Sequence, residues 1–380
     1  MADAPFVVMS GGGTGGHLYP ALAIADALRE ARPDVRVLFL GARRGLEARV
    51  LPERGEEHLL LSVHGIDRRR PLASWRAVTG LISGMARVVR LFSSRRPDVV
   101  VVTGGYAGAP GGIVAGLMGI PLILQEQNSV PGAVTRLLTR FAARIHIAYP
   151  EAVQRLPAAR GRCVVTGNPV RPPSSMDRRR AREAFGIPDD VILVFVTGGS
   201  QGSAAINQGV TAFVEGVSRG RLVRPPALHV LWSTGRAHFD TVEAALDDMG
   251  DPAWVHALPY VDDMPAALSA SDLAVSRAGA MTTAELVNQG LPSILVPLPT
   301  AAERHQTYNA RALESAGAAR LLPESELSGE RLARELRDVT SRPDELKLMR
   351  ARALARARPR ATEDIAEDIA RFLPSARRAA

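Results

Sequence analysis

The sequence is organised around a glycine-rich turn near its start. A short apolar run at 6–9 leads into the turn SGGGTGGH at 10–17, and apolar residues at helical spacing follow it through residue 28. This order predicts a β-strand, a tight turn and an α-helix. Glycines let a ligand approach the main chain, and the unpaired N–H groups of a first helical turn attract negative charge. We therefore expect an anion to bind at this turn.

Two later segments repeat the combination of strand and glycine turn. They lie at 99–108 and at 191–202, so the third copy begins near the middle of the 380-residue chain. A chain of this length is long for a single hydrophobic core. We therefore predict an α/β protein in which two Rossmann-like domains each contain a parallel sheet.

Apolar runs alternate with helical patterns along both halves, which is typical of parallel sheets with right-handed crossovers. A proline-rich stretch at 167–173 separates the halves. We place the domains at 1–170 and 171–360, followed by a helix in 361–380 that could pack back on the first domain. The predicted strands are 6–9, 35–40, 57–63, 99–102, 122–124, 145–148, 164–166, 191–196, 228–233, 254–258, 273–276 and 293–297.

The stretch from Val99 to Leu124 has no charged residue and is long enough to suggest a membrane span. It contains seven glycines and two prolines, which divide it into a strand, a turn, a short helix and a second strand. Central strands of a parallel sheet are buried on both faces and read as continuous apolar runs. We expect this stretch to be the interior of the first domain.

The net charge indicates which partners the protein could bind, and the cysteine count indicates the redox compartment. The formal net charge is +8, and Lys347 is the only lysine among 47 basic residues. A basic protein favours anionic surfaces, and an arginine-mediated nucleic-acid binder is an alternative on charge alone. We expect no nucleic-acid partner, because the sequence has neither a recognition module nor an aromatic platform. The single cysteine, Cys163, excludes an internal disulfide and indicates a reducing compartment.

Common nucleotide motifs are incomplete or absent. Gly11, Gly13 and Gly16 fit the spacing G-x-G-x-x-G, but the next strand, at 35–40, ends without the acidic residue that would hold a ribose. The phosphate-loop motif and a D-x-D triplet are both absent from the sequence. We therefore expect no nicotinamide or flavin cofactor and no metal held through a donor diphosphate. Positive charge would instead come from a helix dipole and from an arginine such as Arg171.

His17 and the segment 276–285 carry the candidate chemical groups. His17 follows the first glycine turn, and an imidazole suits proton transfer near neutral pH. The alternative is an ordinary hydrogen-bonded histidine at a helix start. The segment 276–285 also joins a strand to a helix, where Thr282 and Glu285 could form a capping box. In the other interpretation the helix start holds a diphosphate, and the Glu285 carboxylate takes the two hydroxyls of a ribose.

Taken together, these motifs resemble one family of bacterial enzymes. The matching segments, in order along the chain, are GGTGGH at 12–17, GGY at 104–106, EQN at 126–128, TGNPVR at 166–171, GGSQG at 198–202, DDM at 262–264, SRAGA at 276–280 with Glu285, and Gln306 with Asn309. They cover nearly the whole chain. On these residues the chain resembles the GT-B glycosyltransferases of family 28 that act in bacterial peptidoglycan synthesis.

The resemblance implies two Rossmann-like domains separated by a deep cleft. The membrane-facing N-terminal domain would bind a lipid-linked acceptor, and the C-terminal domain would bind UDP-N-acetylglucosamine (UDP-GlcNAc). The implied reaction is inverting transfer of GlcNAc to the C4 hydroxyl of the N-acetylmuramoyl (MurNAc) unit of undecaprenyl-pyrophosphoryl-MurNAc-pentapeptide (lipid I), which yields lipid II and UDP. The enzyme would work without a cofactor at the cytoplasmic face of the cell membrane. A glycosyltransferase with another lipid acceptor and a non-catalytic UDP-sugar sensor are alternatives.

The resemblance also assigns roles on the acceptor side. We expect His17 to act as the general base, directly or through water, with Glu126 as the second candidate and Tyr106 on the acceptor side. Gln125 stands where the family often has histidine, which argues against a catalytic role for it. His305 stands where a glutamine can occur, and a donor role for His305 stays open.

For the donor, the resemblance implies that Glu285 holds the ribose and that the main chain at Val261 faces the uracil. The residues expected to contact UDP-GlcNAc are Thr14, Gly15, Gly16, Asn128, Arg171, Ser200, Ala280, Met281, Thr282, Thr283, Ala284, Glu285 and Gln306.

The segment 68–92 is a candidate for docking on an anionic membrane surface. Basic groups beside exposed apolar side chains suit a peripheral site on anionic lipid. The alternative is a helix whose apolar side belongs to the core. The residues concerned are Arg68, Arg69, Arg70, Leu72, Trp75, Leu81, Ile82 and Phe92.

Overall fold

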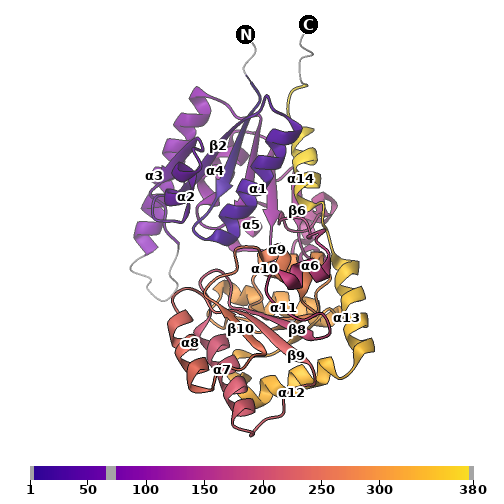
Figure 1. Ribbon diagram of the computed structural model, residues 1–380. Helices are drawn as coiled ribbons and strands as arrows, with labels where there is room; N and C mark the ends of the chain where they lie inside the picture. Colours follow the sequence, from indigo (N-terminus) through magenta and orange to yellow (C-terminus); the bar gives the residue numbers. More distant parts are fainter. Residues whose placement is uncertain (1–3, 66–73, 376–380) are drawn as a thin grey trace. The chain divides into compact units, whose positions relative to one another are not determined.

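The computed structural model describes residues 4–65 and 74–375. The chain divides into two compact units, which are residues 1–170 with 360–380 (unit 1) and residues 171–359 (unit 2). Each unit is built on one parallel sheet with helices packed against it, which confirms the prediction of two Rossmann-like domains (Figure 1). The deep cleft between them stays a prediction. Arg68, Arg69, Arg70 and Leu72 of the proposed docking segment lie outside the described residues.

Unit 1 contains a seven-stranded sheet in the order β3-β2-β1-β4-β5-β6-β7, and its strand pairs are parallel. The strands are β1 (Phe6–Gly11), β2 (Arg36–Ala42), β3 (His58–Leu61), β4 (Val99–Gly104), β5 (Leu122–Glu126), β6 (Arg144–Ile147) and β7 (Cys163–Val165). The helices are α1 (Gly15–Ala31), α2 (Glu47–Glu53), α3 (Ser74–Ser94), α4 (Gly108–Leu117), α5 (Ala133–Leu138), the 3₁₀ helices η2 (Pro150–Arg155) and η3 (Pro157–Arg162), and α14 (Ala361–Ala370).

The sheet of unit 1 is buried on both faces. Along β1 the side chains alternate, so that Val8 packs into one hydrophobic cluster and Val7 and Met9 pack into the other. Successive side chains of a strand point to opposite faces, which explains why the central strands are continuously apolar. The uncharged stretch forms β4, α4 and the first part of β5, and this confirms that it is domain interior. In the described part of the chain no helix is both long enough and apolar enough to cross a membrane.

The last helix, α14, belongs to unit 1 although it follows unit 2 in the sequence. It packs against α1, and its Ile365 and Ile369 join the same buried cluster as Leu22 of α1. Thr362 Oγ1 donates a hydrogen bond to the Val170 carbonyl at 3.4 Å. The helix therefore returns to the place where the chain leaves unit 1.

Unit 2 contains a six-stranded sheet in the order β10-β9-β8-β11-β12-β13, again parallel. The strands are β8 (Ile192–Thr197), β9 (Leu228–Ser233), β10 (Val255–Leu258), β11 (Leu273–Ser276), β12 (Ser293–Leu295) and β13 (Ala319–Leu321). The helices are α6 (Arg178–Glu183), α7 (Ala204–Ser218), α8 (Phe239–Asp248), α9 (Met264–Ala270), α10 (Ala280–Asn288), η4 (Ala302–Arg304), α11 (His305–Ser315), η5 (Glu324–Glu326), α12 (Gly329–Thr340) and α13 (Pro343–Arg356).

The order of strands places the glycine turns of each unit together. In unit 1 the neighbours β1 and β4 both end in glycine turns, and in unit 2 the neighbours β8 and β11 end in the turns at 198–202 and 277–279. Because the strands are parallel, their carboxyl ends meet at one edge of each sheet. Each unit therefore gathers its candidate residues at that edge.

Candidate functional site

The first glycine turn of unit 1, at 10–17, is held by hydrogen bonds to a buried glutamate. Glu47, at the start of α2, is completely buried, and its carboxylate accepts hydrogen bonds from the Gly13 N–H at 2.9 Å and the Ala42 N–H at 2.7 Å. Gly12 has a φ of 143°, and a Cβ there would lie 2.4 Å from Glu47 Oε1. A side chain at Gly12 would therefore displace this carboxylate.

This contact corrects the expectation that the turn itself binds an anion from outside. The Gly13 N–H already has a carboxylate partner within the protein. The N–H groups of Gly15 and Gly16, in the first turn of α1, have no hydrogen-bond acceptor among the described residues. The first helical turn, with its positive dipole end, stays available to an external anion.

His17 lies beside the glycine turn that follows β4. Its Nδ1 is 2.9 Å from the Thr103 carbonyl and 3.1 Å from Gln127 Oε1, and Thr103 Oγ1 donates back to the His17 carbonyl at 2.8 Å. A Cβ on Gly104 would lie 3.0 Å from the imidazole, so glycine is needed for this approach. The ring is therefore held through Nδ1, while Nε2 has no hydrogen-bond partner in the described part of the chain.

The carboxylate of Glu126, the second candidate for the base, is occupied by hydrogen bonds within the protein. It is 2% exposed, and its carboxylate accepts hydrogen bonds from the N–H groups of Asn128 at 3.0 Å and Gly132 at 2.9 Å and from Thr135 Oγ1 at 2.6 Å. The Asn128 side-chain amide donates to the same carboxylate at 3.3 Å. Both oxygens are thus used to hold the loop between β5 and α5. This geometry argues against Glu126 as a general base and for a role in placing Asn128.

Tyr106, predicted on the acceptor side, packs over the first glycine turn. A Cβ on Gly13 would lie 2.5 Å from its ring, and Gly13 has a φ of 91°. Burial, with a smaller contribution from the Glu47 charge, raises the pKa of the Tyr106 hydroxyl. The phenol therefore stays neutral near neutral pH and can donate or accept a hydrogen bond.

In unit 2 the helix α10 starts earlier than a capping box would require. Its N-cap is Gly279 and the helix begins at Ala280, so Thr282 is already inside the first turn. The N-cap residue itself, Gly279, provides no side-chain cap. The capping-box interpretation of Thr282 and Glu285 is therefore wrong. The N–H groups of Met281 and Thr282 have no hydrogen-bond acceptor among the described residues, as a diphosphate site at the helix start needs.

Glu285 lies one turn into α10 and is partly buried, and its carboxylate accepts no hydrogen bond from the described residues. Burial raises the pKa of its carboxyl to about 7, and the positive charge of Arg171 opposes this shift. A small pocket brings the two side chains together and is otherwise formed mainly by apolar groups; its residues are Arg171, Pro172, Pro173, Ser174, Met264, Pro265, Leu268, Glu285 and Gln289. An unpaired carboxylate beside an arginine can accept a pair of hydroxyls there.

Other predicted donor residues of unit 2 surround the same end of the sheet. Ser200 is exposed in the turn after β8. Gln306 accepts a hydrogen bond from the Leu298 N–H at 2.9 Å through Oε1, which leaves its NH₂ group without a hydrogen-bond acceptor among the described residues. Asn309 is fully buried and donates to the Ala278 carbonyl at 3.3 Å, so it supports the turn before α10.

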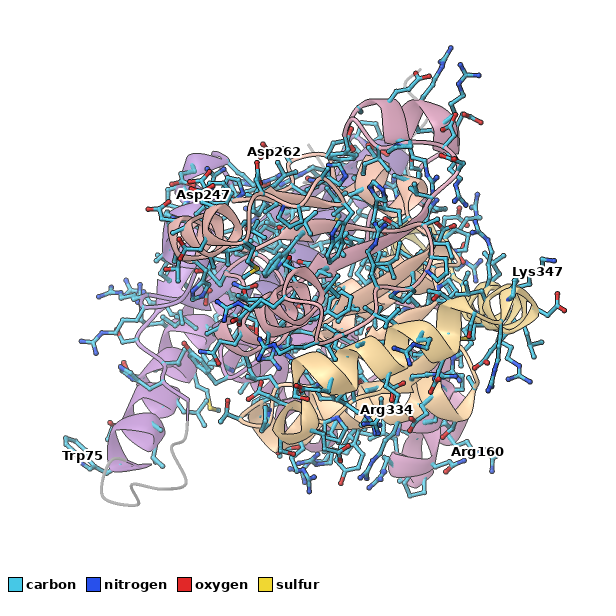
Figure 2. The ribbon with its side chains drawn as sticks, turned by 60° about the horizontal axis from the view of Figure 1, so that its bottom comes forward. Trp75, Arg160, Asp247, Asp262, Arg334 and Lys347 are labelled. Atoms are coloured by element: carbon cyan, nitrogen blue, oxygen red, sulfur yellow. The ribbon has the colours of Figure 1, made fainter. Side chains whose placement is uncertain are left out.

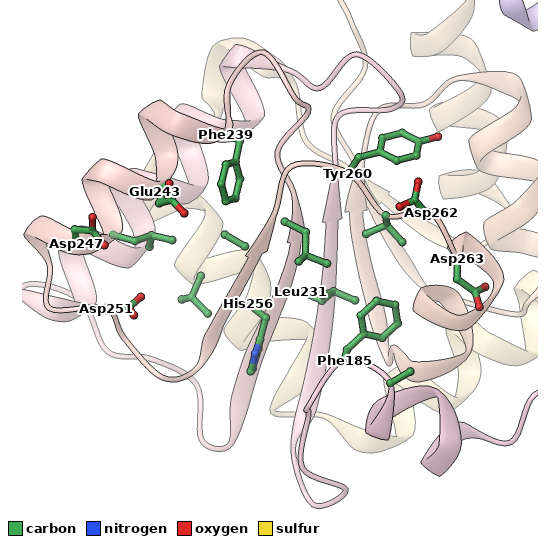
Figure 3. A pocket seen from close by; sticks show the side chains of 16 residues that line it. Phe185, Leu231, Phe239, Glu243, Asp247, Asp251, His256, Tyr260, Asp262 and Asp263 are labelled. Carbon is green, nitrogen blue, oxygen red and sulfur yellow. The ribbon is translucent and has the colours of Figure 1, made fainter.

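A larger pocket of about 700 Å³ lies at the β10 edge of the same sheet (Figure 3). Val261, predicted to face the uracil, is one of its lining residues, as are Tyr260 and Asp262. Figure 3 shows Glu243 and Asp247 along α8 on the opposite side from Tyr260. The predicted donor residues of the α10 helix start do not line this pocket, so its size alone does not identify the donor site.

The sequence did not predict the roles of two residues, Glu47, which holds the first glycine turn, and Gln127, which contacts His17. In the sequence Glu47 looks like an ordinary acidic residue in the first turn of a helix, and Gln127 stands only as part of the EQN segment at 126–128, without a role of its own. The only local signal for Glu47 is the crowd of glycines around it, because a Cβ on Gly41 or Gly45 would lie within 2.5 Å of its side chain. These glycines can be linked to Glu47 only when the tertiary structure is known, because the sequence does not show which side chain each glycine faces.

Comparison with known proteins agrees with this arrangement. Residues 7–147 match the glycosyltransferase family 28 N-terminal domain, and residues 193–367 match the glycosyltransferase family 28 C-terminal domain. The two matches cover one unit each in large part, and both include the glycine turns described above.

Curated relatives match over nearly their full length. The UDP-N-acetylglucosamine--N-acetylmuramyl-(pentapeptide) pyrophosphoryl-undecaprenol N-acetylglucosamine transferase of Salinibacter ruber is 42% identical over 367 residues, with 96% of each chain covered. The Moorella thermoacetica protein of the same name is 39% identical, with 97% of this chain and 99% of the relative covered. The crystal structure of Acinetobacter baumannii MurG is 29% identical with a TM-score of 0.77, covering 97% of this chain and 99% of that one. This chain therefore belongs to glycosyltransferase family 28.

Proposed function

We propose that this protein is the N-acetylglucosaminyltransferase that converts lipid I to lipid II. It transfers GlcNAc from UDP-GlcNAc to the C4 hydroxyl of the MurNAc unit of undecaprenyl-pyrophosphoryl-MurNAc-pentapeptide, with inversion at the anomeric carbon. The full-length relatives carry the name of this activity, and both family 28 domains are present. The activity is that of a UDP-GlcNAc-dependent hexosyltransferase in peptidoglycan synthesis.

The observation that carries the mechanism is the geometry of His17. Its Nδ1 is occupied by carbonyl oxygens, and its Nε2 has no partner among the described residues. In the proposed step Nε2 accepts the proton of the C4 hydroxyl, directly or through one water. The hydroxyl oxygen forms a bond to the anomeric carbon while the bond from that carbon to the UDP oxygen breaks. The imidazolium then holds the proton that the acceptor has lost.

Unit 2 supplies the groups for the donor in this proposal. The N–H groups of Met281 and Thr282 in the first turn of α10, together with the helix dipole, stabilise the diphosphate, whose negative charge increases as UDP leaves. Glu285 accepts hydrogen bonds from the ribose hydroxyls. In unit 1, the main-chain N–H groups of Gly15 and Gly16 in the first turn of α1 are available to an anion. No step in this scheme uses a metal or an organic cofactor.

Peripheral docking on an anionic membrane forms the second part of the proposal. The helix α3 exposes apolar side chains on one face, namely Trp75 at 62%, Val78 at 52%, Ile82 at 62% and Val89 at 44%. Figure 2 shows Trp75 projecting from the start of this helix. Helical spacing places the four side chains along one side, where they can enter the interfacial layer of a membrane that holds lipid I. The enzyme would then work at the cytoplasmic face of the cell membrane.

The core interpretation applies to one face of this helix, and docking stays a proposal for the exposed face. Phe92, predicted among the docking residues, is 1% exposed and packs in the core together with Val88. Leu81 is partly buried. Trp75 and Ile82 remain on the exposed face. The docking surface is therefore narrower than the sequence pattern indicated.

UDP release from UDP-GlcNAc tests the enzymatic proposal. We expect release that depends on added lipid I and that falls by roughly 10²- to 10⁴-fold in His17→Gln, because the general base is lost. The control is Gln154→Glu, which changes an exposed residue of the same unit. Release with a diacylglycerol acceptor but not with lipid I would favour another lipid acceptor. Binding of UDP-GlcNAc without lipid I-dependent release would favour a sensor.

A further inference from the structure

Three buried side-chain amides form a hydrogen-bonded chain behind His17. Gln125, Gln127 and Asn168 are 0%, 2% and 3% exposed. Gln127 Nε2 donates to Gln125 Oε1, Gln125 Nε2 donates to Asn168 Oδ1 at 3.1 Å, and Asn168 Nδ2 donates to the Gln127 carbonyl at 3.0 Å. Gln127 Oε1 lies 3.1 Å from His17 Nδ1. We refer to these three residues as the amide chain.

The contacts of Gln127 determine the orientation of its amide. Its Nε2 lies near three acceptors, which are the Thr103 carbonyl at 2.6 Å, the Gln125 carbonyl at 3.3 Å and Gln125 Oε1. A flipped amide would place an oxygen against all three, and a buried cluster of unpaired acceptors is costly. Nε2 must therefore face these acceptors, which turns Oε1 toward His17.

This orientation decides the tautomer of His17. The two groups within reach of Nδ1 are the Thr103 carbonyl and Gln127 Oε1, and both can only accept a hydrogen bond. A neutral imidazole carries one N–H, and only an N–H at Nδ1 satisfies these acceptors. The lone pair is then on Nε2, the nitrogen that takes the proton in the proposed reaction.

We propose that Gln127, held by Gln125 and Asn168, is a positioning residue that keeps neutral His17 in the Nδ1–H tautomer. Its catalytic meaning rests on the proposed role of His17 as the general base. The amide chain orients the ring with neutral groups, so it adds no negative charge next to the imidazole. Asn168, which contacts both Gln125 and Gln127, lies two residues before Val170, where the first segment of unit 1 ends.

The surrounding titratable groups do not replace the amide chain in this role. The elements around the ring carry Tyr19 on α1, Tyr106 after β4, Glu126 on β5 and Glu47 on α2. Glu47 is hydrogen-bonded to the main-chain N–H groups of Gly13 and Ala42, and Glu126 to N–H groups of its own loop. These groups are the same in the wild type and in the variants below, so they cannot cause a difference between them.

The first test measures the tautomer directly in the wild-type protein. Full-length protein labelled with ¹⁵N-histidine is examined by long-range ¹H–¹⁵N correlation spectra above the titration of the ring, and the His17 signals are assigned by their loss in His17→Gln. We expect an Nε2 resonance of the unprotonated type and an Nδ1 resonance of the protonated type. An Nε2–H tautomer, or averaged resonances for the two nitrogens, would overturn the proposal.

The second test places a carboxylate at the contact. In Gln127→Glu a negative charge next to the imidazole stabilises the protonated ring, so the acid limb of kcat/KM should move to higher pH by roughly one unit. The NMR titration midpoint of His17 should rise with it. The matched control is Gln154→Glu, which makes the same change on an exposed side chain of unit 1 and should shift neither. An unshifted His17 titration in folded Gln127→Glu contradicts the proposal.

The two tests separate this proposal from the proposed function. If the Nδ1–H tautomer is observed but His17→Gln turns over normally, the positioning holds and the assignment of the base fails. If His17→Gln is inactive but the wild-type ring is the Nε2–H tautomer, the base assignment stands and the positioning role of Gln127 fails. The wild-type spectrum needs no variant other than the assignment control, so poor folding of Gln127→Glu does not decide the outcome.

Discussion

Three glutamates near the candidate residues differ in what surrounds their carboxylates. Glu47 and Glu126 are almost fully buried and bind main-chain N–H groups of loops. The carboxylate of Glu285 is partly buried and accepts no hydrogen bond from the described residues, while burial raises the pKa of this carboxyl. The first two therefore shape loops, and only Glu285 has oxygens free for a ligand.

The raised pKa of Glu285 predicts a pH dependence of donor binding. The carboxyl titrates at about pH 7, so it is neutral below this value and ionised above it. Because the ionised form accepts both ribose hydroxyls, KM for UDP-GlcNAc should fall as the pH rises from about 6 to about 8. In Glu285→Gln we expect KM to increase by roughly 10- to 100-fold and its pH dependence to disappear.

Steady-state kinetics at several pH values with saturating lipid I provide the measurement. Glu330→Gln serves as the control, since it removes an exposed carboxylate on α12 in the same unit and lines neither pocket. A Glu285→Gln enzyme that keeps the wild-type KM and the same pH profile would show that this carboxylate does not hold the donor.

At the scale of elements, α14 is attached to unit 1 through a buried ionisable cluster. His146 on β6 is 1% exposed, and its Nε2 lies 3.2 Å from Asp368 Oδ2 of α14 without hydrogen-bond alignment. Arg144 Nε lies 3.0 Å from the same oxygen. Burial lowers the pKa of His146 to about 4; the Asp368 charge opposes this shift and the Arg144 charge adds to it.

This cluster predicts that α14 loosens in acid. The unfolded imidazole takes up its proton near pH 6.5 and the folded one near pH 4, so between these values the unfolded state binds more protons. The free energy of unfolding therefore falls as the pH is lowered from 6.5 to 4, by up to roughly 3 kcal/mol. In His146→Gln this part of the acid sensitivity should be lost.

Hydrogen exchange of the α14 amides, corrected for intrinsic rates, is the measurement for this prediction. The wild type should lose protection between about pH 6.5 and pH 4, and His146→Gln should lose less. His64→Gln removes an exposed histidine of the same unit and should behave like the wild type. Equal loss of protection in all three proteins would refute the assignment to His146.

At the scale of the whole molecule, the proposed acceptor is a lipid, so the protein must reach a membrane surface. The exposed apolar face of α3 and the preceding Arg68, Arg69 and Arg70 are the candidate contacts. Each basic residue near an anionic surface contributes about 1 kcal/mol, and each buried apolar side chain about 1.5–3 kcal/mol. A few such groups are enough for reversible binding.

We expect the double variant Trp75→Ser, Ile82→Ser to bind phosphatidylglycerol vesicles at least roughly 10-fold more weakly than the wild type. Reversal of charge at Arg68–Arg70 and added salt should each weaken binding as well. Vesicle co-sedimentation provides the measurement. Val223→Ser, which changes a side chain in unit 2 that is 69% exposed, is the control. If vesicle binding is unchanged in the double variant, after charge reversal and in added salt, this surface is excluded as the membrane-docking site.

Much of the fold could be predicted from local sequence. Apolar runs ending in glycine turns predicted the central strands of both sheets, because buried parallel strands and left-handed turn residues each leave a local pattern. The short elements α6 and β13 were missed, since one helical turn of arginines and a three-residue strand carry little periodic signal. The capping box was wrong because α10 begins three residues before Ser-Thr-type capping would place it.

Residue types and their order along the chain were sufficient to predict two parallel-sheet units and the turns that carry the candidate residues. The roles of His17 as the base and of Glu285 as the ribose-binding carboxylate stay predictions. The tertiary structure decided which of the polar residues are free. Glu47 fills the anion position at Gly13, Glu126 is used by its own loop, and the amide chain faces His17. The hydrogen bonds of Glu47 with Gly13 and of Gln127 with His17 join residues that are far apart in sequence, so their pairing depends on strand order and burial, which local patterns do not contain.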